Sequence, residues 1–142
     1  MKLIDTNVWV HALSEGSPMR EKAQDITNVL MGLGEAAISI QNIIELYSAM
    51  TKTISPKEAA YWCDRFMETD AIVKLEPSKK DASDAIEAAK RLNLRRSQAF
   101  DALLAATAKN NGIKTIVTEN VKDFAGLGLE IETIDTTTFD LD

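Results

Sequence analysis

Residues 1–12 read MKLIDTNVWVHA and contain a junction between a strand and a helix. The apolar pair Leu3-Ile4 is typical of a buried strand, and it ends abruptly on Asp5. Thr6-Asn7 follows, and apolar residues then recur at helical spacing, so a helix is expected from Val8 capped by Thr6 or Asn7. An aspartate at such a junction either caps the helix or serves as a ligand in a binding site. The rest of the sequence has to distinguish these two roles.

The remaining chain repeats this alternation of short apolar runs and helical patterns. Further strands are expected at 36–39, 71–75, 115–118 and 131–134. Helices are expected from the Ser17-Pro18 cap to the stop at Gly34, from Ile40, after the Ser55-Pro56 cap, after the capping box at Ser78, and from Ser97 to Gly112. Alternating strands and helices predict an α/β protein with a mostly parallel sheet. No repeat or linker interrupts the pattern, so one domain is expected over residues 1–142.

The spacing of apolar residues also predicts which helix faces are buried. The predicted buried positions are Ile40, Ile43, Ile44 and Tyr47, then Ala59, Trp62, Cys63 and Phe66, then Ala82, Ala85, Ile86, Ala89 and Leu92, and finally Phe100, Leu103, Leu104 and Thr107. Glu45 therefore lies among apolar neighbours, where a charged side chain needs a specific reason to be.

Composition narrows the possible chemistry. The chain carries a net charge of -6, which argues against a protein that coats nucleic acid through positive charge. A single cysteine, Cys63, and a single histidine, His11, exclude an intrachain disulfide and the usual Cys/His zinc site. We expect Cys63 to belong to the core and His11 to be an ordinary, satisfied residue. With no long apolar run and no signal peptide before Asp5, a soluble cytoplasmic protein without membrane contact is expected.

Carboxylates must therefore carry any catalysis, and several of them lie where a parallel sheet places ligands. Asp5 ends the first strand, Glu45 lies early in the helix after the second, and Asp101 lies in the first turn of the helix from Ser97. Glu119, Asn120 and Asp123 follow the strand at 115–118. Carboxylates that converge repel one another and raise their pKa values unless a cation lies between them. Mg²⁺ or Mn²⁺ prefers oxygen ligands, and a bound ion can activate water for attack on a phosphodiester.

Four segments in this order resemble the motifs of PIN domains, and more narrowly those of VapC-type toxin ribonucleases. They are LIDTNVWV, IIEL, AFDALLAATAKNNGI and IVTENVKDF, and the resemblance spans nearly the whole chain. It implies a three-layer α/β/α sandwich and a Mg²⁺- or Mn²⁺-dependent endoribonuclease that hydrolyses RNA. It also implies a homodimer and a small antitoxin protein as partner.

The resemblance also assigns roles to individual residues. Asp5, Glu45 and Asp101 match the three core acids of the family and are expected to hold the metal. The fourth position matches Asn120, with Asp123 three residues later; Asn120 brings no charge, which weakens a second metal site. The hydroxyls of Thr6 and Thr118 are expected to hydrogen-bond in or near the site, and Asn7 is expected to cap a helix.

Structural roles remain open for several of these residues. Asp101 can complement a helix dipole, Asn120 is common in turns, and Asp123 can cap a short helical turn at Phe124. Glu119 is expected to be a solvated neighbour. The basic cluster, which includes Arg91, Arg95 and Arg96, either ends a helix in solvent or contacts RNA phosphates beside Asp101. No aromatic residue is interleaved with this cluster, so base stacking is not indicated.

Three other functions compete with the nuclease. A non-catalytic PIN-like module with a weakened metal site would bind RNA or protein, which the charge of -6 and Asn120 favour and the three core acids oppose. A receiver-type phosphoryl-transfer domain needs an aspartate after the third strand, where the sequence has Glu76. A Rossmann dinucleotide site is excluded, since no G-x-G-x-x-G follows the first strand.

Overall fold

Successive side chains of the central strands point to opposite sides of the sheet, and both sides are apolar. Ile4 of β1 (Lys2–Ile4) and Val117 of β4 (Thr115–Val117) belong to one buried cluster. Their neighbours Leu3 and Ile116 belong to a second cluster on the other side. Burial on both faces is what a parallel sheet requires when helices cover each side.

The protein is described here by a computed structural model that covers residues 1–139; the last three residues of the predicted domain, 140–142, lie outside this range. The other strands are β2 (Ala36–Ser39), β3 (Val73–Leu75) and β5 (Glu130–Glu132). All five are parallel, in the order β3-β2-β1-β4-β5. The chain builds one side of the sheet from β1 and then crosses to β4. The boundary between β1 and β4 is therefore a switch point, where ligands bind in such sheets.

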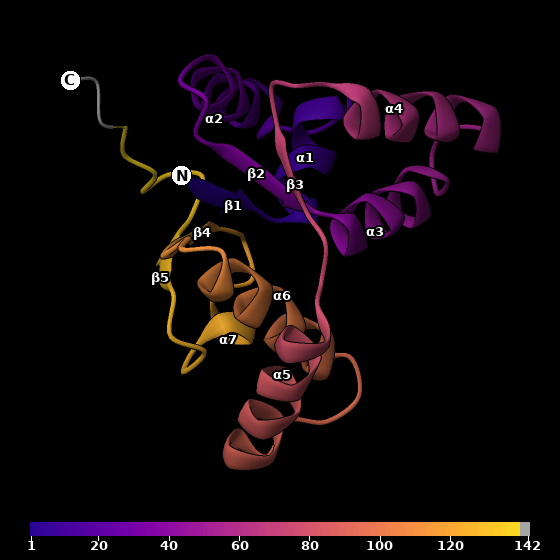
Figure 1. Ribbon diagram of the computed structural model, residues 1–142. Helices are drawn as coiled ribbons and strands as arrows, with labels where there is room; N and C mark the ends of the chain where they lie inside the picture. The colour runs from indigo at the N-terminus through magenta and orange to yellow at the C-terminus, as the bar shows by residue number, and fades with distance from the viewer. Residues whose placement is uncertain (140–142) are drawn as a thin grey trace.

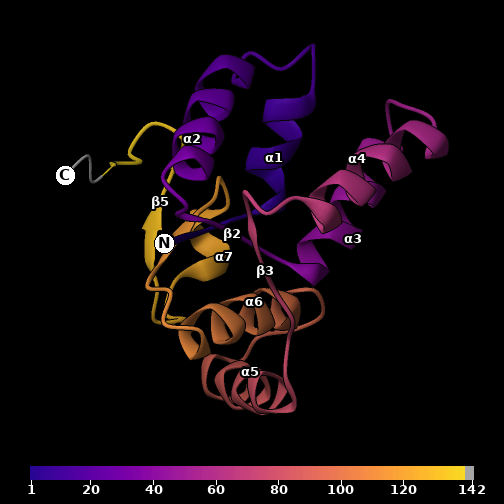
Figure 2. The ribbon, with the colours of Figure 1, turned by 45° about the horizontal axis from the view of Figure 1, so that its top comes forward.

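Helices form a layer on each face of the sheet (Figure 1). One layer contains α1 (Thr6–Leu13), α2 (Arg20–Gly32), α3 (Ile40–Met50) and α4 (Pro56–Glu68). The other contains α5 (Lys79–Leu92), α6 (Gln98–Asn110) and the short α7 (Val121–Phe124). Figure 2 shows α1 with α2 and α3 with α4 as two neighbouring pairs. The predicted α/β/α sandwich is confirmed.

Helix starts differ from the prediction in two places. Asp5, not Thr6 or Asn7, is the N-cap of α1, because its side chain accepts a hydrogen bond from the Thr6 N–H and the helix begins at Thr6. The second helix begins at Arg20 rather than at Pro18. The Ser17 hydroxyl oxygen accepts the Met19 N–H and so stabilises a turn before the helix.

The predicted buried faces were wrong at several positions. Ile44, Ile86 and Phe100 are 69%, 70% and 58% exposed, and Trp62 of α4 is also exposed. Apolar spacing identifies residues on the same side of a helix. The rest of the protein covers only part of that side, so some of the apolar residues stay exposed. The surroundings of Glu45 are therefore less apolar than its sequence neighbours suggest, since Ile44 faces outward.

Three strands are shorter than predicted or shifted. β3 covers 73–75 rather than 71–75, β5 covers 130–132 rather than 131–134, and β4 ends at Val117. Thr118 follows β4 directly and is completely buried. Its side chain turns toward the end of β1, where the candidate site begins.

Candidate active site

Asp5 lies at the switch point, and only 6% of its surface is exposed. Its Oδ1 accepts the Thr6 N–H at 2.8 Å, and its Oδ2 accepts the Thr118 hydroxyl at 2.8 Å. Burial raises the pKa of Asp5, the hydrogen bonds lower it, and the charges of Glu45 and Asp123 raise it further. The net result is a raised pKa. Asp5 therefore caps α1 through one oxygen and belongs to a charged cluster at the same time.

Glu45 reaches this cluster from the middle of α3. Its Oε2 accepts the Thr6 hydroxyl at 3.1 Å, and its Oε1 accepts the Gln41 amide at 2.9 Å. The predicted hydroxyl of Thr6 thus connects the start of α1 to Glu45. The negative charge of Glu45 acts on both Asp5 and Asp101 and raises the pKa of each.

Asp101 occupies the first turn of α6 and is half-buried. Burial, followed by the charges of Asp123, Asp5 and Glu45, raises the pKa of Asp101 to about 7. Among residues 1–139 no donor or cation pairs with its side chain. A carboxylate held next to three others without a counter-charge is destabilised in its ionised form unless a cation binds nearby.

The β4–α7 loop brings the Asp123 carboxylate into this cluster, whereas Asn120 is connected to it through its backbone. Asp123 lies in α7, and its charge raises the pKa values of Asp5 and Asp101. Asn120 precedes α7 without a side-chain cap, and its backbone N–H donates to the Thr118 hydroxyl oxygen at 3.0 Å. Its carbonyl oxygen accepts the Asp123 N–H at 3.0 Å, so within the described part of the chain the hydrogen bonds of Asn120 to these residues are made by its backbone.

Sequence reasoning missed the polar residues that hold the acids in place. Asn42 is completely buried, and its amide donates to the Thr6 hydroxyl oxygen at 3.2 Å and to Asp5 at 3.4 Å. Asn7 does not cap a helix; its amide donates to Thr118 at 3.2 Å and to Asp5 at 3.4 Å. The sequence signal for Asn42 was its position three residues after Ser39, where its Oδ1 accepts the Ser39 N–H at 3.3 Å as part of a capping box.

The cluster fits a hydrated divalent cation. Its donors are oxygen atoms, which Mg²⁺ and Mn²⁺ prefer. Gln41 adds a buried amide oxygen, Oε1, that has no hydrogen-bond partner within residues 1–139. Over the same residues, no three carboxylate, imidazole or thiol side chains stand close enough to bind an ion directly together. Mg²⁺ retains several waters and is usually held by one or two carboxylates, so the other acids would act through water.

The predicted basic cluster lies beside this site in the sequence and is exposed. Arg91 is in the last turn of α5, and Arg95 and Arg96 lie in the connection to α6. None of the three takes part in an ion pair within the described residues. Their charges are available to an anionic ligand near the first turn of α6, where Asp101 lies.

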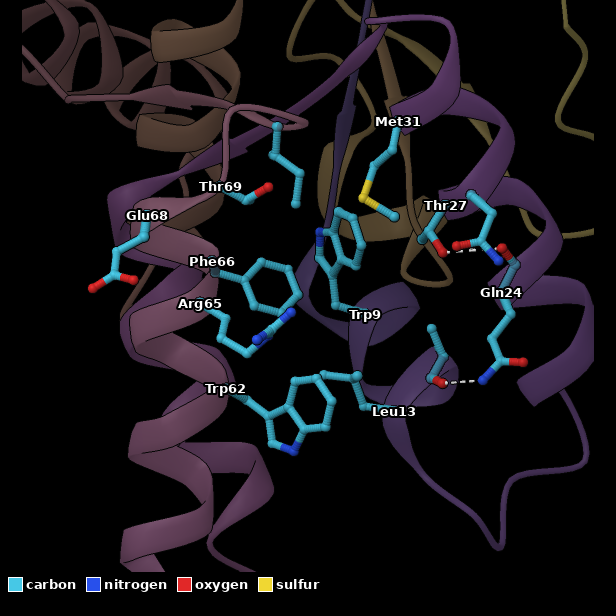
Figure 3. A pocket seen from close by; sticks show the side chains of 13 residues that line it. Trp9, Leu13, Gln24, Thr27, Met31, Trp62, Arg65, Phe66, Glu68 and Thr69 are labelled. Atoms are coloured by element: carbon cyan, nitrogen blue, oxygen red, sulfur yellow. Dashed lines mark hydrogen bonds between the residues drawn. The ribbon is translucent and has the colours of Figure 1, made fainter.

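A groove of about 660 Å³ lies between α1, α2 and α4, and none of the carboxylates above lines it (Figure 3). Trp9 and Leu13 of α1 face Phe66 and Trp62 of α4, and in Figure 3 the Arg65 guanidinium appears between the Phe66 and Trp62 rings. The Trp9 ring meets Phe66 edge to face, with centroids 4.9 Å apart. Its buried Nε1–H has no acceptor within residues 1–139. The groove thus combines apolar walls with two charged side chains, Arg65 and Glu68.

Within residues 1–139, none of the helices has both the length and the apolar character needed to cross a membrane.

Comparisons with known proteins agree with this geometry. The PIN domain family model matches residues 2–127. Ribonuclease VapC24 of Mycobacterium tuberculosis is 25% identical over 134 residues, which cover 90% of this chain and 92% of that protein. A DNA-bound VapBC structure from Salmonella typhimurium has a TM-score of 0.71 at 19% identity, covering 94% and 99% of the two chains. The Mycobacterium tuberculosis toxin VapC20, described as cleaving the sarcin-ricin loop, has a TM-score of 0.68 at 16% identity, covering 82% and 87%. At these identities the two structures support the fold alone.

Proposed function

The chain belongs to the PIN domain family, and on this premise we propose that it is a Mg²⁺- or Mn²⁺-dependent endoribonuclease, the toxin of a toxin–antitoxin pair. The observation that carries the proposal is Asp101, whose pKa is raised to about 7 by burial and by three neighbouring carboxylates. Such a cluster is stable in its ionised form only when a cation neutralises it. The name of the ribonuclease relative supports RNA as the substrate.

Each acidic residue has a distinct role in this proposal. Asp5, which hydrogen bonds hold through both oxygens, and Glu45, oriented by Thr6, would hold the ion together with Asp101, directly or through water. When bound, the ion would lower the pKa of a water and stabilise negative charge on the phosphate. Asp123 would add a fourth charge from the opposite side of the switch point.

Two further groups complete the proposed site. Thr118 orients Asp5 and also accepts the Asn120 N–H, so Asn120 belongs to the site through the position of its loop. The guanidinium groups of Arg91, Arg95 and Arg96 would contact RNA phosphates. They supply local positive charge on a protein whose net charge is -6, and phosphate contacts of this kind position a nucleic acid without reading its sequence.

We further propose that the groove binds a segment of the antitoxin. Several structures of similar fold are toxin–antitoxin complexes, including one from Klebsiella pneumoniae. A segment with apolar side chains and a carbonyl or carboxylate would fill the groove, and its oxygen would accept from the Arg65 guanidinium. A hydrogen bond to a charged group of this kind contributes about 1.5–3 kcal/mol, so it would stabilise the complex. The resemblance also favours a homodimer, a single domain over residues 1–142 and action in the cytoplasm.

The groove is tested by Trp62→Ala in a chain co-expressed with the proposed small antitoxin. We expect the variant to lose most of the co-purified partner while its RNA cleavage stays intact, because Trp62 lines the groove and is remote from the acids. Met67→Ala is the matched control, since Met67 is an exposed apolar residue on α4 that does not line the groove. Equal losses in both variants would count against the groove as the antitoxin site.

The nuclease is tested with purified protein and a mixed RNA pool, in Mg²⁺, in Mn²⁺ and in EDTA, with single-stranded DNA of the same sequences alongside. We expect RNA cleavage with either ion and none in EDTA. Cleavage that persists in EDTA would contradict the metal-dependent mechanism. Intact RNA, from folded protein that the ions still stabilise against heat, would favour the non-catalytic PIN-like binding module.

A further inference from the structure

The single histidine of the chain connects three segments that are separate in the sequence. His11 of α1 donates from Nε2 to Glu119 Oε1 at 2.8 Å, and its Nδ1 contacts the Ser17 hydroxyl. A carboxylate only accepts hydrogen bonds, so Nε2 carries the hydrogen. The Ser17 hydroxyl then donates to Nδ1 while its oxygen accepts the Met19 N–H. Both ring nitrogens are engaged, which fixes the orientation of the ring.

The same loop residue is held a second time by the same helix. The backbone N–H of Glu119 donates to Asn7 Oδ1 at 3.2 Å, and Asn7 in turn donates to Thr118. Asn7 and His11 lie four residues apart, on one side of α1. One helix therefore holds Glu119 by its backbone and by its side chain, directly beside Thr118 and ahead of Asn120 and Asp123.

We call these two contacts of Glu119, with Asn7 and with His11, the clamp. The clamp determines which acids face the cluster. The charges of Glu45 and Asp123 raise the pKa of Asp5, and the charges of Asp123, Asp5 and Glu45 raise that of Asp101; Glu119 contributes to neither. Glu119 is nevertheless the direct neighbour of Thr118, whose hydroxyl contacts Asp5. The carboxylate of Glu119 points to His11 instead, which keeps a fifth negative charge out of the cluster and anchors the β4–α7 loop.

We propose that His11 is a positioning residue for the metal site: by holding Glu119, it fixes the β4–α7 loop and Asp123 relative to Asp5 and Asp101. The proposal rests on the metal-dependent function proposed above. Mg²⁺ requires a nearly ideal octahedral arrangement, whereas Ca²⁺ accepts irregular ones. Loss of the clamp should therefore weaken Mg²⁺ binding far more than Ca²⁺ binding. A general loss of stability would not discriminate between the two ions.

The experiment compares His11→Ala and His11→Gln with wild type by titrating each ion against the melting temperature. For His11→Ala we expect an apparent Kd for Mg²⁺ raised about tenfold, the lower end for residues that orient metal ligands. For Ca²⁺ we expect a change of less than about threefold. His11→Gln should recover most of the Mg²⁺ affinity, because the glutamine amide can still donate to Glu119. The control is Lys22→Ala, which breaks an exposed ion pair with Asp135 outside the site.

Amide hydrogen exchange of the metal-free protein provides a second measurement that does not depend on any ion. We expect His11→Ala to reduce protection at Glu119 and Asn120, and Lys22→Ala to leave it unchanged. Equal weakening of both ions, or unchanged protection in the loop, would overturn the proposal. If no ion stabilised the wild type, the proposed nuclease function would fail, and the exchange data would still decide whether His11 holds the loop.

Discussion

Asp5→Asn is expected to give a folded protein that no longer cleaves RNA. Asparagine caps helices as well as aspartate does, so its Oδ1 can still accept the Thr6 N–H. The substitution removes a buried negative charge that the proposed metal needs and that repels Glu45 and Asp123 in its absence. We expect cleavage to fall at least about a hundredfold, the scale on which single electrostatic contributions to a transition state are lost.

The measurement pairs cleavage rates with melting curves. In EDTA, we expect Asp5→Asn to melt within about 4 °C of wild type, which corresponds to about 1 kcal/mol for a chain of this size. The stabilisation by Mg²⁺ should disappear. Asp135→Asn, a change at an exposed acid outside the site, is the matched control and should behave as wild type. A variant at Asp5 that retained metal-dependent cleavage would show that this carboxylate only caps α1.

Metal binding is expected to weaken steeply below about pH 7, because Asp101 must release a proton before it can contribute to the site. The affinity should fall by up to about tenfold per pH unit for each proton released. RNA cleavage should rise with pH over the same range. The stability of the metal-free protein should instead fall as pH rises. The reason is that Asp101 keeps its proton to a higher pH in the folded state than in the unfolded chain.

The sign of the pH effect on the stability of the metal-free protein follows from the linkage between proton binding and folding. The pKa of Asp101 is 3.8 in a model peptide and about 7 in the folded protein, so between these values the folded state binds more protons. The stability contributed by protonated Asp101 is thus complete below pH 3.8 and is lost as pH rises through about 7. Melting curves from pH 4 to 8 in EDTA measure this loss. Asp101→Asn should flatten both profiles, and a variant with an unchanged pH dependence would assign the titration to another group.

The sequence was sufficient to predict the sheet layers and the convergence of the acids near one edge of the sheet, because both follow from where the strands end. A parallel strand buried on both faces reads as an apolar run, and its carboxyl end is where Asp5 stands. Helix faces were less predictable: spacing alone could not show that Ile44 and Phe100 lie outside the contact with the sheet. Which side of an apolar stripe is covered depends on neighbouring elements, and a single helix does not encode it.

The supporting contacts could not be predicted for a different reason. His11 and Glu119 are 108 positions apart, and Asp5 and Thr118 are 113 positions apart, so neither pair leaves a local pattern. Such contacts require the strand order to be known first. Asn42 was closer to detection, since its spacing from Ser39 indicates a capping box, but its contact with Asp5 joins residues 37 positions apart.

The eight residues of α1 serve two surfaces at once. Asn7 and His11 hold the loop beside the acids, and Trp9 and Leu13 line the groove proposed for the antitoxin. If the proposed toxin and antitoxin diverge together, substitutions on α1 would risk altering the acid cluster as well as the binding of the antitoxin. Residues contributed to the groove by α2 and α4 carry no such double constraint. Diversification of partner specificity is therefore expected to accumulate on those two helices, while α1 evolves slowly.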